Sequence, residues 1–312
     1  MLLKEISIKN FRGIREGTLS DLTHVNILVG RNNTGKSSVL EALCYGGDLA
    51  AGGLDILGRQ RRNYLLSRRV QRTGINILEL PYGMKEMNQM RIALIFKDGA
   101  MLRSEGQALI SPPQGTDSAP ARQWIGRVLL VDPATVREFG QFETRLWEDI
   151  KRDRKDRVIV EVIKDAYEVE VDNIGFGSFG GTYKLALETR ERTVPIDVVG
   201  DGLRQGIAIL SAAVVMNDSP LALEEPETHQ HPESLRRLLL ALFKMAKRND
   251  IQLFISTHSL ELISCALQAA EKAQLDLKIY HLTRTEDGIL KARGISAPDA
   301  KVLTDMGPDP RT

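Results

Sequence analysis

The chain has 312 residues, which is enough for one large domain or a domain of two lobes with a well-buried core. Its 42 Lys and Arg residues nearly balance 41 Asp and Glu residues, and the net charge of +1 excludes a protein whose whole surface is committed to nucleic acid. No stretch has the roughly 18 apolar residues that cross a bilayer, and the N-terminus is not typical of a signal peptide, so we expect a cytoplasmic protein without membrane contact.

The first predicted elements are two strands and a helix. Residues 3–11 alternate apolar and polar side chains, and residues 25–29 form a short apolar run that ends at Gly30. From residue 36 to residue 44 the apolar side chains recur at helical spacing, and Cys44 falls among them. The glycine-rich segment between the second strand and the helix is therefore a strand-to-helix loop.

The middle of the chain carries weaker signals. Residues 46–75 are rich in glycine and arginine, and residues 106–122 are rich in proline, so we expect two surface excursions. Residues 91–96 and 127–131 are predicted strands. The apolar run 158–163 follows a charged stretch and fits either a strand or a helix.

Regular alternation returns from Gly202 onwards. We expect a helix over 202–215, a strand over 221–223, a helix from Pro232, a strand over 251–256 and a helix from Ser259, which contains Cys265. Strands that alternate with helices predict a parallel sheet covered on both faces. We expect both cysteines to be reduced core residues.

The loop after the second strand matches the phosphate-binding pattern G-x-x-x-x-G-K-[ST] at every fixed position. Backbone N–H groups of such a loop surround the phosphates, Lys36 reaches the β and γ oxygens, and the Ser37 hydroxyl ligates Mg²⁺. The alternative, a glycine turn that matches by chance, leaves the polar clusters described next unexplained. The predicted nucleotide-binding residues of the loop are Gly30, Asn32, Asn33, Thr34, Gly35, Lys36, Ser37 and Ser38.

Two polar clusters follow the last two predicted strands. Glu224 and Glu225 end one strand, where Glu224 would hold Mg²⁺ through water and Glu225 would polarise the attacking water. His258 follows the next strand, so it falls on the same sheet edge and would contact the γ-phosphate or the water. The alternatives are a solvated strand end for the acids and an ordinary packed or surface residue for His258.

These segments resemble the ABC-type ATPases of the SMC and RecF-like group, and especially the ATPase heads of the OLD (overcoming lysogenization defect) family. The resemblance implies an α/β P-loop NTPase fold: an ABC-type head with a mixed-sheet lobe, a parallel-sheet core covered by helices, and a helical lobe that carries the signature loop. Residues 1–312 would form one domain, with a nucleotide-binding core at about 1–100 and 195–312 and an inserted lobe at about 101–194. The segments that carry the resemblance are Asn10-Phe11-Arg12-Gly13-Ile14, Gly30 to Ser38, Glu224 to Pro232 and Ser256-Thr257-His258-Ser259.

The resemblance also implies roles. Glu224 would be the Walker B acid, Glu225 the catalytic base, His258 the switch histidine, and residues 229–232 the D-loop. Arg12 would lie near the nucleotide.

A signature loop is implied at residues 199–205, where Gly200 and Gly202 would cap the γ-phosphate of ATP bound to the opposite subunit. Gly200 stands where the family more often has serine, and Asp201 adds a negative charge, and either change would slow hydrolysis or weaken closure. The alternative for this segment is a glycine N-cap before a buried helix.

The function implied is a homodimer that sandwiches ATP and Mg²⁺ between its subunits and acts as a conformational switch. As an enzyme it would be a slow ATPase that controls a nuclease or toxin effector in phage defence, or a DNA transaction in repair. The alternative is an ATP-locked scaffold with little turnover. A transporter subunit and a small-molecule kinase fit the motifs less well, and the chain after His258 leaves no room for the Toprim nuclease of full-length OLD proteins.

Six arginines crowd the segment from Arg59 to Arg72, with Tyr64 among them. Such a patch would bind the phosphates of DNA or RNA, with Tyr64 as a stacking ring. A solvated basic loop, or a docking surface for an acidic partner, fits the same residues.

Overall fold

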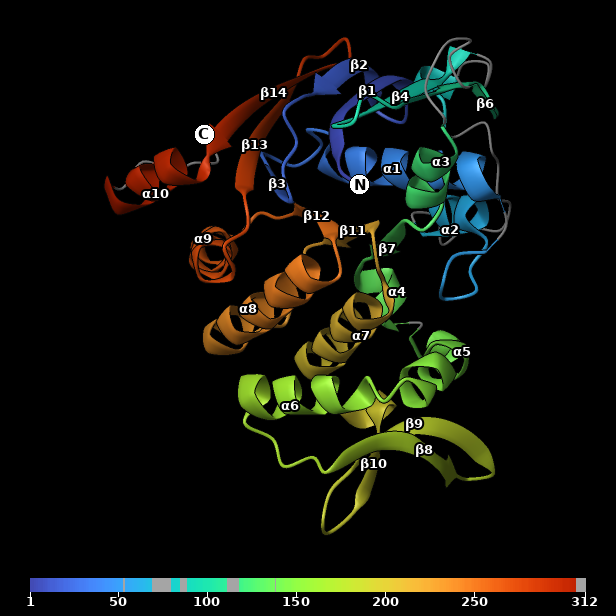
Figure 1. Cartoon of the computed structure of the whole chain (residues 1–312), viewed down its shortest axis with the longest axis vertical. Coiled ribbons are helices and arrows are strands. Elements are labelled where there is room, and N and C mark those ends of the chain that lie inside the picture. Colours follow the sequence, from blue (N-terminus) through green and yellow to red (C-terminus); the bar gives the residue numbers. More distant parts are fainter. Residues whose placement is uncertain (53, 69–79, 85–88, 111–117, 138, 307–312) are drawn as a thin grey trace.

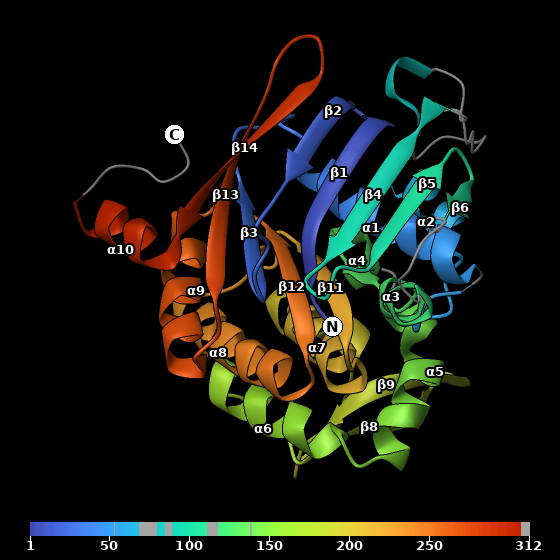
Figure 2. The same cartoon turned by 45° about the horizontal axis from the view of Figure 1, so that its top comes forward.

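The structure is a computed structural model that describes residues 1–52, 54–68, 80–84, 89–110, 118–137 and 139–306. Within these residues the largest feature is one mixed sheet (Figures 1 and 2). Its strands are β1 (Leu3–Phe11), β2 (Ile14–Leu19), β3 (Val25–Val29), β4 (Arg91–Phe96), β5 (Met101–Glu105), β6 (Ala108–Ile110), β7 (Leu129–Val131), β11 (Ser219–Glu224), β12 (Ile251–Ser256), β13 (Leu277–Arg284) and β14 (Ile289–Ser296).

The order of the strands across the sheet is β6-β5-β4-β1-β2-β14-β13-β3-β12-β11-β7. The strands from β13 to β7 in this order pair in parallel, with β3 between β12 and β13. The strands from β6 to β2 pair antiparallel. The parallel core predicted from the sequence is thus confirmed, and an antiparallel half extends it.

Two apolar layers cover the two faces of the sheet, because successive side chains of a strand point to opposite faces. In β3, Val25, Ile27 and Val29 face one layer, and Leu28 faces the other. Helices α7 (Asp201–Val215), α8 (Pro232–Arg248) and α9 (Leu260–Ala273) cover the first face, and α1 (Lys36–Ala51), α2 (Arg61–Ser67) and α3 (Ala119–Ile125) cover the second. Both cysteines are buried and free, as predicted.

A smaller lobe lies beyond α7 (Figure 1). It contains the second sheet, in the order β10-β9-β8, together with α5 and α6. The bounds of these elements and of the remaining helices are α4 (Pro133–Arg137), α5 (Phe139–Arg152), α6 (Asp156–Tyr167), β8 (Asn173–Phe179), β9 (Thr182–Glu188), β10 (Thr193–Pro195) and α10 (Ala297–Met306), with short 3-10 turns η2 (Tyr82–Met84) and η4 (Ile196–Val198). No helix in the described ranges has the length and apolar character needed to span a bilayer.

Several predictions for the middle of the chain are wrong. The predicted excursion at 46–75 instead begins inside α1, which continues to Ala51, and it contains α2. The second predicted excursion contains β6 and most of α3, and its residues 111–117 lie outside the described part. The ambiguous run 158–163 is the centre of α6, whose Ile159 and Ile163 are fully buried.

Candidate functional site

The glycine-rich loop joins the C-terminal end of β3 to the N-terminus of α1. Its backbone needs left-handed conformations, with φ of 141° at Gly30, 66° at Asn33 and 104° at Gly35. Gly30 also lies against the neighbouring strand, since a Cβ there would come within 2.4 Å of the Leu282 carbonyl oxygen. The glycines of the motif are therefore required by conformation and by close approach, and the loop leaves the backbone N–H groups at the start of α1 free to meet an anion.

Lys36 is held by its own loop. Its Nζ donates hydrogen bonds to the carbonyl oxygens of Gly30, at 2.9 Å, and Arg31, at 3.1 Å. Thr34 closes the same turn by donating to the Arg31 carbonyl oxygen. Burial lowers the pKa of Lys36, and the nearby Glu225 carboxylate partly offsets that effect.

Glu224 and Glu225 lie at the end of β11, beside the end of β12. Glu225 has a left-handed backbone, with φ of 49°, and its N–H donates to the Ser256 carbonyl oxygen. The His258 Nε2 lies 3.9 Å from Oε1 of Glu225, and the two side chains are 39% and 43% exposed. Two neighbouring parallel strands thus deliver both polar groups to one edge of the sheet.

A cavity of about 430 Å³ joins these elements. Most of the predicted site residues line it: Asn32, Asn33, Gly35, Lys36, Ser37, Ser38, Glu224, Glu225 and His258. Gly30 and Thr34 shape the loop behind it through the contacts given above. The loop, the acid pair and the histidine, far apart in the sequence, therefore share one space.

The structure does not bring Arg12 into this cavity. The Arg12 side chain is 8% exposed, and its Nε donates to Oε2 of Glu41 at 2.7 Å. A second nitrogen donates to the Leu65 carbonyl oxygen. Arg12 is adjacent to a lining residue, Gly13, but its guanidinium is directed into the interior.

Gly200 and Gly202 lie at the N-terminus of α7, also outside the cavity. The Gly202 carbonyl oxygen accepts hydrogen bonds from Tyr167 and from Gln230, in the segment predicted to be the D-loop. Further along α7, Nε2 of Gln205 donates to the Glu225 carbonyl oxygen at 3.2 Å. The segment resembling a signature loop is thus bonded to the acid-bearing strand end of its own subunit.

The prediction that Arg59 to Arg72 form a nucleic-acid-binding patch is wrong for the arginines whose side chains are buried. Arg59 pairs with Asp55, and Arg61 donates to the Gly126 carbonyl oxygen. Tyr64 is 8% exposed and lies against the Arg59 guanidinium, so it offers no stacking face to a base. Arg62 pairs with Asp48, Arg68 pairs with three carboxylates, and Arg69 and Arg72 lie outside the described residues.

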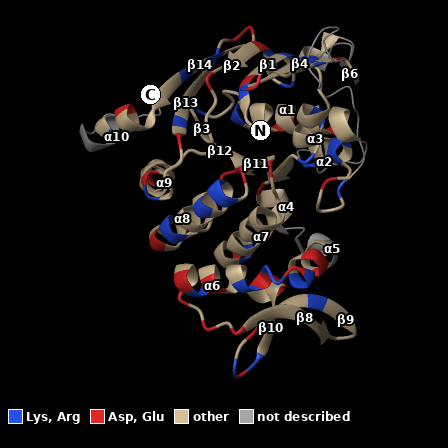
Figure 3. Cartoon of the chain, viewed as in Figure 1, with Lys and Arg blue, Asp and Glu red and all other residues tan. Residues whose placement is uncertain are grey.

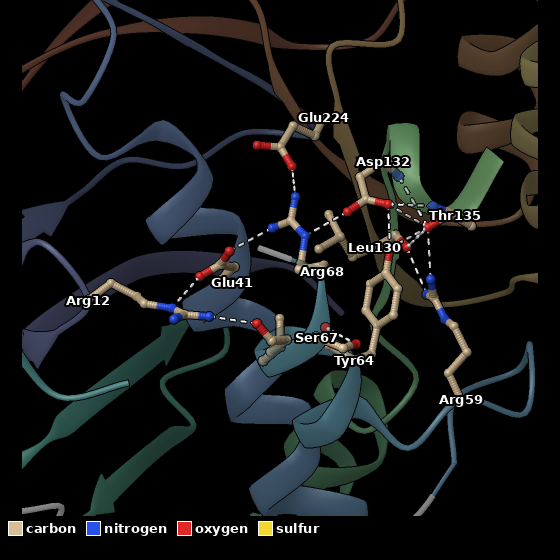
Figure 4. Close-up of polar contacts among 11 residues, drawn as sticks. Arg12, Glu41, Arg59, Tyr64, Ser67, Arg68, Leu130, Asp132, Thr135 and Glu224 are labelled. Carbon is tan, nitrogen blue, oxygen red and sulfur yellow. Dashed lines mark hydrogen bonds and ion pairs between the residues drawn. The ribbon is translucent and has the colours of Figure 1, made fainter. Parts of the chain in front are cut away.

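Arg68 lines the cavity and was not predicted as a site residue. It pairs with Glu41, Asp132 and Glu224, as Figure 4 shows. Burial would lower the pKa of Arg68, but the carboxylates of Asp132 and Glu41 raise it overall. Burial would likewise raise the pKa of Asp132, but Arg68 and the Tyr64 hydroxyl lower it overall. Both groups are therefore charged.

Three further lining residues escaped prediction: Gly13, Ser256 and Arg284. Arg284 ends β13, the other neighbour of β3, and donates to the Gly13 carbonyl oxygen at 2.8 Å. Ser256 is opposite Glu224 in register and its hydroxyl is buried without a partner among the described residues. The strand-end rule that located His258 also indicates Ser256, which ends the predicted strand 251–256, and it would have indicated Arg284 if β13 had been recognised.

The donor set fits Mg²⁺. The described residues contain no cluster of three or more His, Cys, Asp or Glu that could hold a metal ion. Magnesium beside a nucleotide needs fewer protein ligands, because phosphates and waters complete its octahedron. The Ser37 hydroxyl and the Glu224 carboxylate supply hard oxygen donors on the cavity wall, with the unpartnered Ser256 hydroxyl beside them.

Charged residues of both signs are interspersed over both lobes (Figure 3), in keeping with the net charge of +1. Among the described residues, the cavity of about 430 Å³ gathers the motif residues and is the candidate functional site.

The chain is similar to several ATPases. It is 21% identical over 323 residues to an ATP/GTP phosphatase of Helicobacter pylori, covering 84% of this chain and 86% of that protein. Over 43 residues it is 49% identical to the DNA double-strand break repair Rad50 ATPase of Archaeoglobus fulgidus, covering 14% of this chain and 5% of Rad50. The solved SMC head bound to the C-winged helix domain of ScpA superposes with a TM-score of 0.61 at 12% identity, covering 97% of this chain and all of that one.

The fold is therefore that of an SMC head, an α/β P-loop NTPase fold, as predicted. Residues 1–45 match the model of the family "AAA ATPase domain". Residues 93–264 match the model of the family "AAA domain, putative AbiEii toxin, Type IV TA system". Because this second match spans more than half of the chain and contains the acid pair and His258, the protein belongs to that family of AAA-domain ATPases.

Proposed function

We propose that the protein binds and hydrolyses ATP with Mg²⁺ and works as a dimeric conformational switch. The observation that carries the proposal is the convergence of Lys36, Glu225 and His258 on one cavity of about 430 Å³. The similarity to an ATP/GTP phosphatase over most of both chains supports hydrolysis. Residues 1–312 would act as one ATPase domain, with a core at about 1–100 and 195–312 and an inserted lobe at about 101–194.

The side chains divide the work of phosphoryl transfer. Lys36 would exchange the Gly30 and Arg31 carbonyl oxygens for the β- and γ-phosphates, whose negative charge would offset the burial that lowers the pKa of Lys36. Glu225 would orient a water for attack on the γ-phosphorus and accept its proton, and His258 would contact the γ-phosphate. Ser37 and Glu224 would hold Mg²⁺, which neutralises the charge on the phosphate oxygens.

The second subunit would complete the site. Gly200 is exposed, with no atom within 4 Å of the place where a Cβ would lie, so the start of α7 has room for a phosphate bound to a partner subunit. Two-fold pairing would create two such shared sites. ATP would favour the closed dimer, and hydrolysis would reopen it.

The output would be control of an effector, either a nuclease or toxin in phage defence or a DNA transaction in repair. The resemblance to OLD-family heads supports the first, and the local similarity to Rad50 supports the second. An ATP-locked scaffold is the second candidate, because Asp201, 60% exposed at the start of α7, would place a negative charge near the partner's γ-phosphate.

Two substitutions test the proposal. Lys36→Ala should lose nucleotide binding, because the phosphates lose their main cation. Glu225→Gln should bind ATP with near-normal affinity, lower phosphate release by about 100-fold or more, and accumulate ATP-dependent dimers on size-exclusion chromatography.

Steady-state phosphate release from the unaltered protein separates an ATPase from a scaffold. Glu148→Gln, an exposed carboxylate on α5, is the matched control and should behave as wild type. Hydrolysis at the wild-type rate by Glu225→Gln would show that Glu225 is not the base.

A further inference from the structure

Arg68 holds together three carboxylates that come from three different elements. Its Nη1 lies 2.7 Å from Oε1 of Glu41 in α1, and its Nε lies 2.6 Å from Oδ2 of Asp132, just after β7. Its Nη2 contacts Oε2 of Glu224 at the end of β11. The Arg68 side chain is only 6% exposed, and Figure 4 shows the guanidinium at the centre of the three acids.

Two of these acids have other cationic or hydroxyl partners. Glu41 also accepts from Arg12, and Asp132 also accepts from the Tyr64 hydroxyl and from the Thr135 backbone N–H at 2.7 Å. Both would stay compensated if Arg68 shifted. The contacts of Arg68 with Glu41 and Asp132 fix its Nη1 and Nε atoms, and its Nη2 group is the part that faces Glu224.

Glu224 differs from the other two acids. Among the described residues, the Arg68 guanidinium is the one side-chain group that its carboxylate bonds. Glu224 and Arg68 both line the cavity beside Ser37. The acid that is suited to magnesium is thus already bonded to a cation within the protein.

Magnesium and Arg68 therefore compete for the same carboxylate. Cations brought within a few ångströms in a buried site repel strongly, so Glu224 cannot serve both fully at once. An arginine released from a carboxylate finds an equivalent partner in a phosphate oxygen, which accepts the same planar donors. A nucleotide in the cavity would supply that oxygen.

We infer that Arg68 controls metal binding at Glu224. It pairs with Glu224 when the cavity is empty. When nucleotide enters, the Arg68 Nη2 group moves to a phosphate oxygen, which frees Glu224 for the metal. The inference rests on the proposed ATP site. Its consequence is that metal and nucleotide bind cooperatively, because metal alone has to displace Arg68 without offering it a new partner.

The test measures Mn²⁺ binding by electron paramagnetic resonance, with and without ADP, which avoids turnover. Wild type should bind Mn²⁺ weakly alone and far more tightly with ADP. Arg68→Lys keeps the charge, but a compact ammonium cannot bond three carboxylates in this fork geometry. In this variant Mn²⁺ alone should bind about tenfold more tightly, and the enhancement by ADP should fall by a similar factor.

Two further variants keep the result interpretable. Arg59→Lys alters a buried arginine that pairs with Asp55, so this variant should bind Mn²⁺ as wild type does. If Arg68→Lys does not fold, as judged by circular dichroism, the double variant Arg68→Gln with Glu41→Gln removes an acid together with the cation and should show the same gain.

The outcomes separate the two proposals. Unchanged or weaker Mn²⁺ binding in the Arg68 variants, with a normal wild type, overturns the role of Arg68 and leaves the ATP site standing. A wild-type protein that binds neither ADP nor Mn²⁺ with ADP overturns both.

Discussion

Glu227 occupies an unusual place for an acid two residues after Glu225. Its Oε1 accepts a hydrogen bond from the Thr257 hydroxyl at 2.5 Å, and its Oε2 is buried without a partner among the described residues. Burial raises the pKa of this carboxyl above its ordinary value of 4.5, and the Thr257 bond only partly offsets it. The folded protein therefore binds a proton at Glu227 more tightly than the unfolded chain does.

Glu227→Gln should stabilise the protein at alkaline pH. An acid with a raised folded pKa loses stability as the pH rises from its unfolded value through its folded value. The variant removes that loss, so its free energy of unfolding should exceed that of wild type by about 1 kcal/mol at pH 8, and the gain should vanish below pH 4.5. Urea denaturation at several pH values measures this difference, with the exposed Glu148→Gln as control. A gain independent of pH would contradict the assignment.

The site residues that could be predicted from the sequence are those that belong to a contiguous motif or directly follow an apolar strand. The loop with Lys36 and Ser37 could be recognised because its pattern is contiguous, and Glu225 and His258 because each follows an apolar strand. Arg68 could not be recognised, because it enters the cavity only through contacts with Asp132 and Glu224, which are distant in the sequence. Arg12, which the resemblance placed near the nucleotide, pairs with the buried Glu41, and nothing nearby in the sequence indicates that partner.

Among the elements, the start of α7 shows how a glycine can mark a contact. A Cβ at Gly202 would lie 2.4 Å from the His229 carbonyl oxygen, a backbone atom that cannot move aside easily. Gly200, two residues earlier, has open space around it. A glycine is needed at Gly202 because the backbone packs against residues 229–230, whereas Gly200 leaves a surface open.

Gly202→Ala should push α7 away from the segment 229–230. We expect the free energy of unfolding to fall by about 2 kcal/mol, the usual cost of overpacking. Gly200→Ala is the matched control and should change it by less than about 1 kcal/mol, since the new methyl meets no atom within 4 Å. Chemical denaturation of both variants makes the comparison. Equal stability of the two would mean that the close approach at Gly202 is relaxed in solution.

The same reasoning explains why the helix ends in the middle of the chain were mispredicted. Gly46 and Gly47 suggested a break, but they lie within α1. A Cβ at Gly47 would come within 2.3 Å of a Val128 methyl group, so this glycine permits close packing of the helix. The arginines of α2 suggested solvent exposure, yet Arg61 is buried and donates to the Gly126 carbonyl oxygen. Whether a glycine breaks a helix or permits close packing, and whether an arginine is exposed or buried, depends on which residues pack against it.

For the molecule as a whole, the closing of two subunits is the event that the proposed function needs. Asp201 is 60% exposed and lies 3.4 Å from Arg204, a long contact that screens its charge little. In a closed dimer it would stand near the partner's nucleotide, where like charges repel.

Asp201→Asn in the Glu225→Gln background should therefore strengthen ATP-dependent dimerisation. At low salt we expect the dissociation constant of the dimer to fall about fivefold, and the gain to shrink as salt is added. Analytical ultracentrifugation in the presence of ATP measures it. Glu271→Gln, a 71% exposed acid on α9, is the control and should leave dimerisation unchanged. A dimer insensitive to Asp201 would place α7 away from the interface.

The architecture was predictable only where strands and helices alternate in order. The parallel strands β11 and β12 follow each other along the chain with α8 between them, so the sequence indicated their pairing. The resemblance implied a mixed-sheet lobe, but β13, β14 and the sheet of the smaller lobe were not predicted from the residues, because strands such as β14 are only partly buried and carry a weak apolar pattern. Pairing of β14 with β2 joins segments near opposite ends of the chain, which no local signal reveals.

The position of β3 in the sheet has a consequence for how the protein is made. This strand leads into the phosphate loop, yet both of its hydrogen-bonded neighbours, β12 and β13, are encoded more than 200 residues later. A nascent chain on the ribosome therefore carries a finished loop sequence without the strands that support it. The strands that flank β3 are complete only after residues up to Arg284 have emerged, so ATP binding at the proposed site would wait for this point of translation.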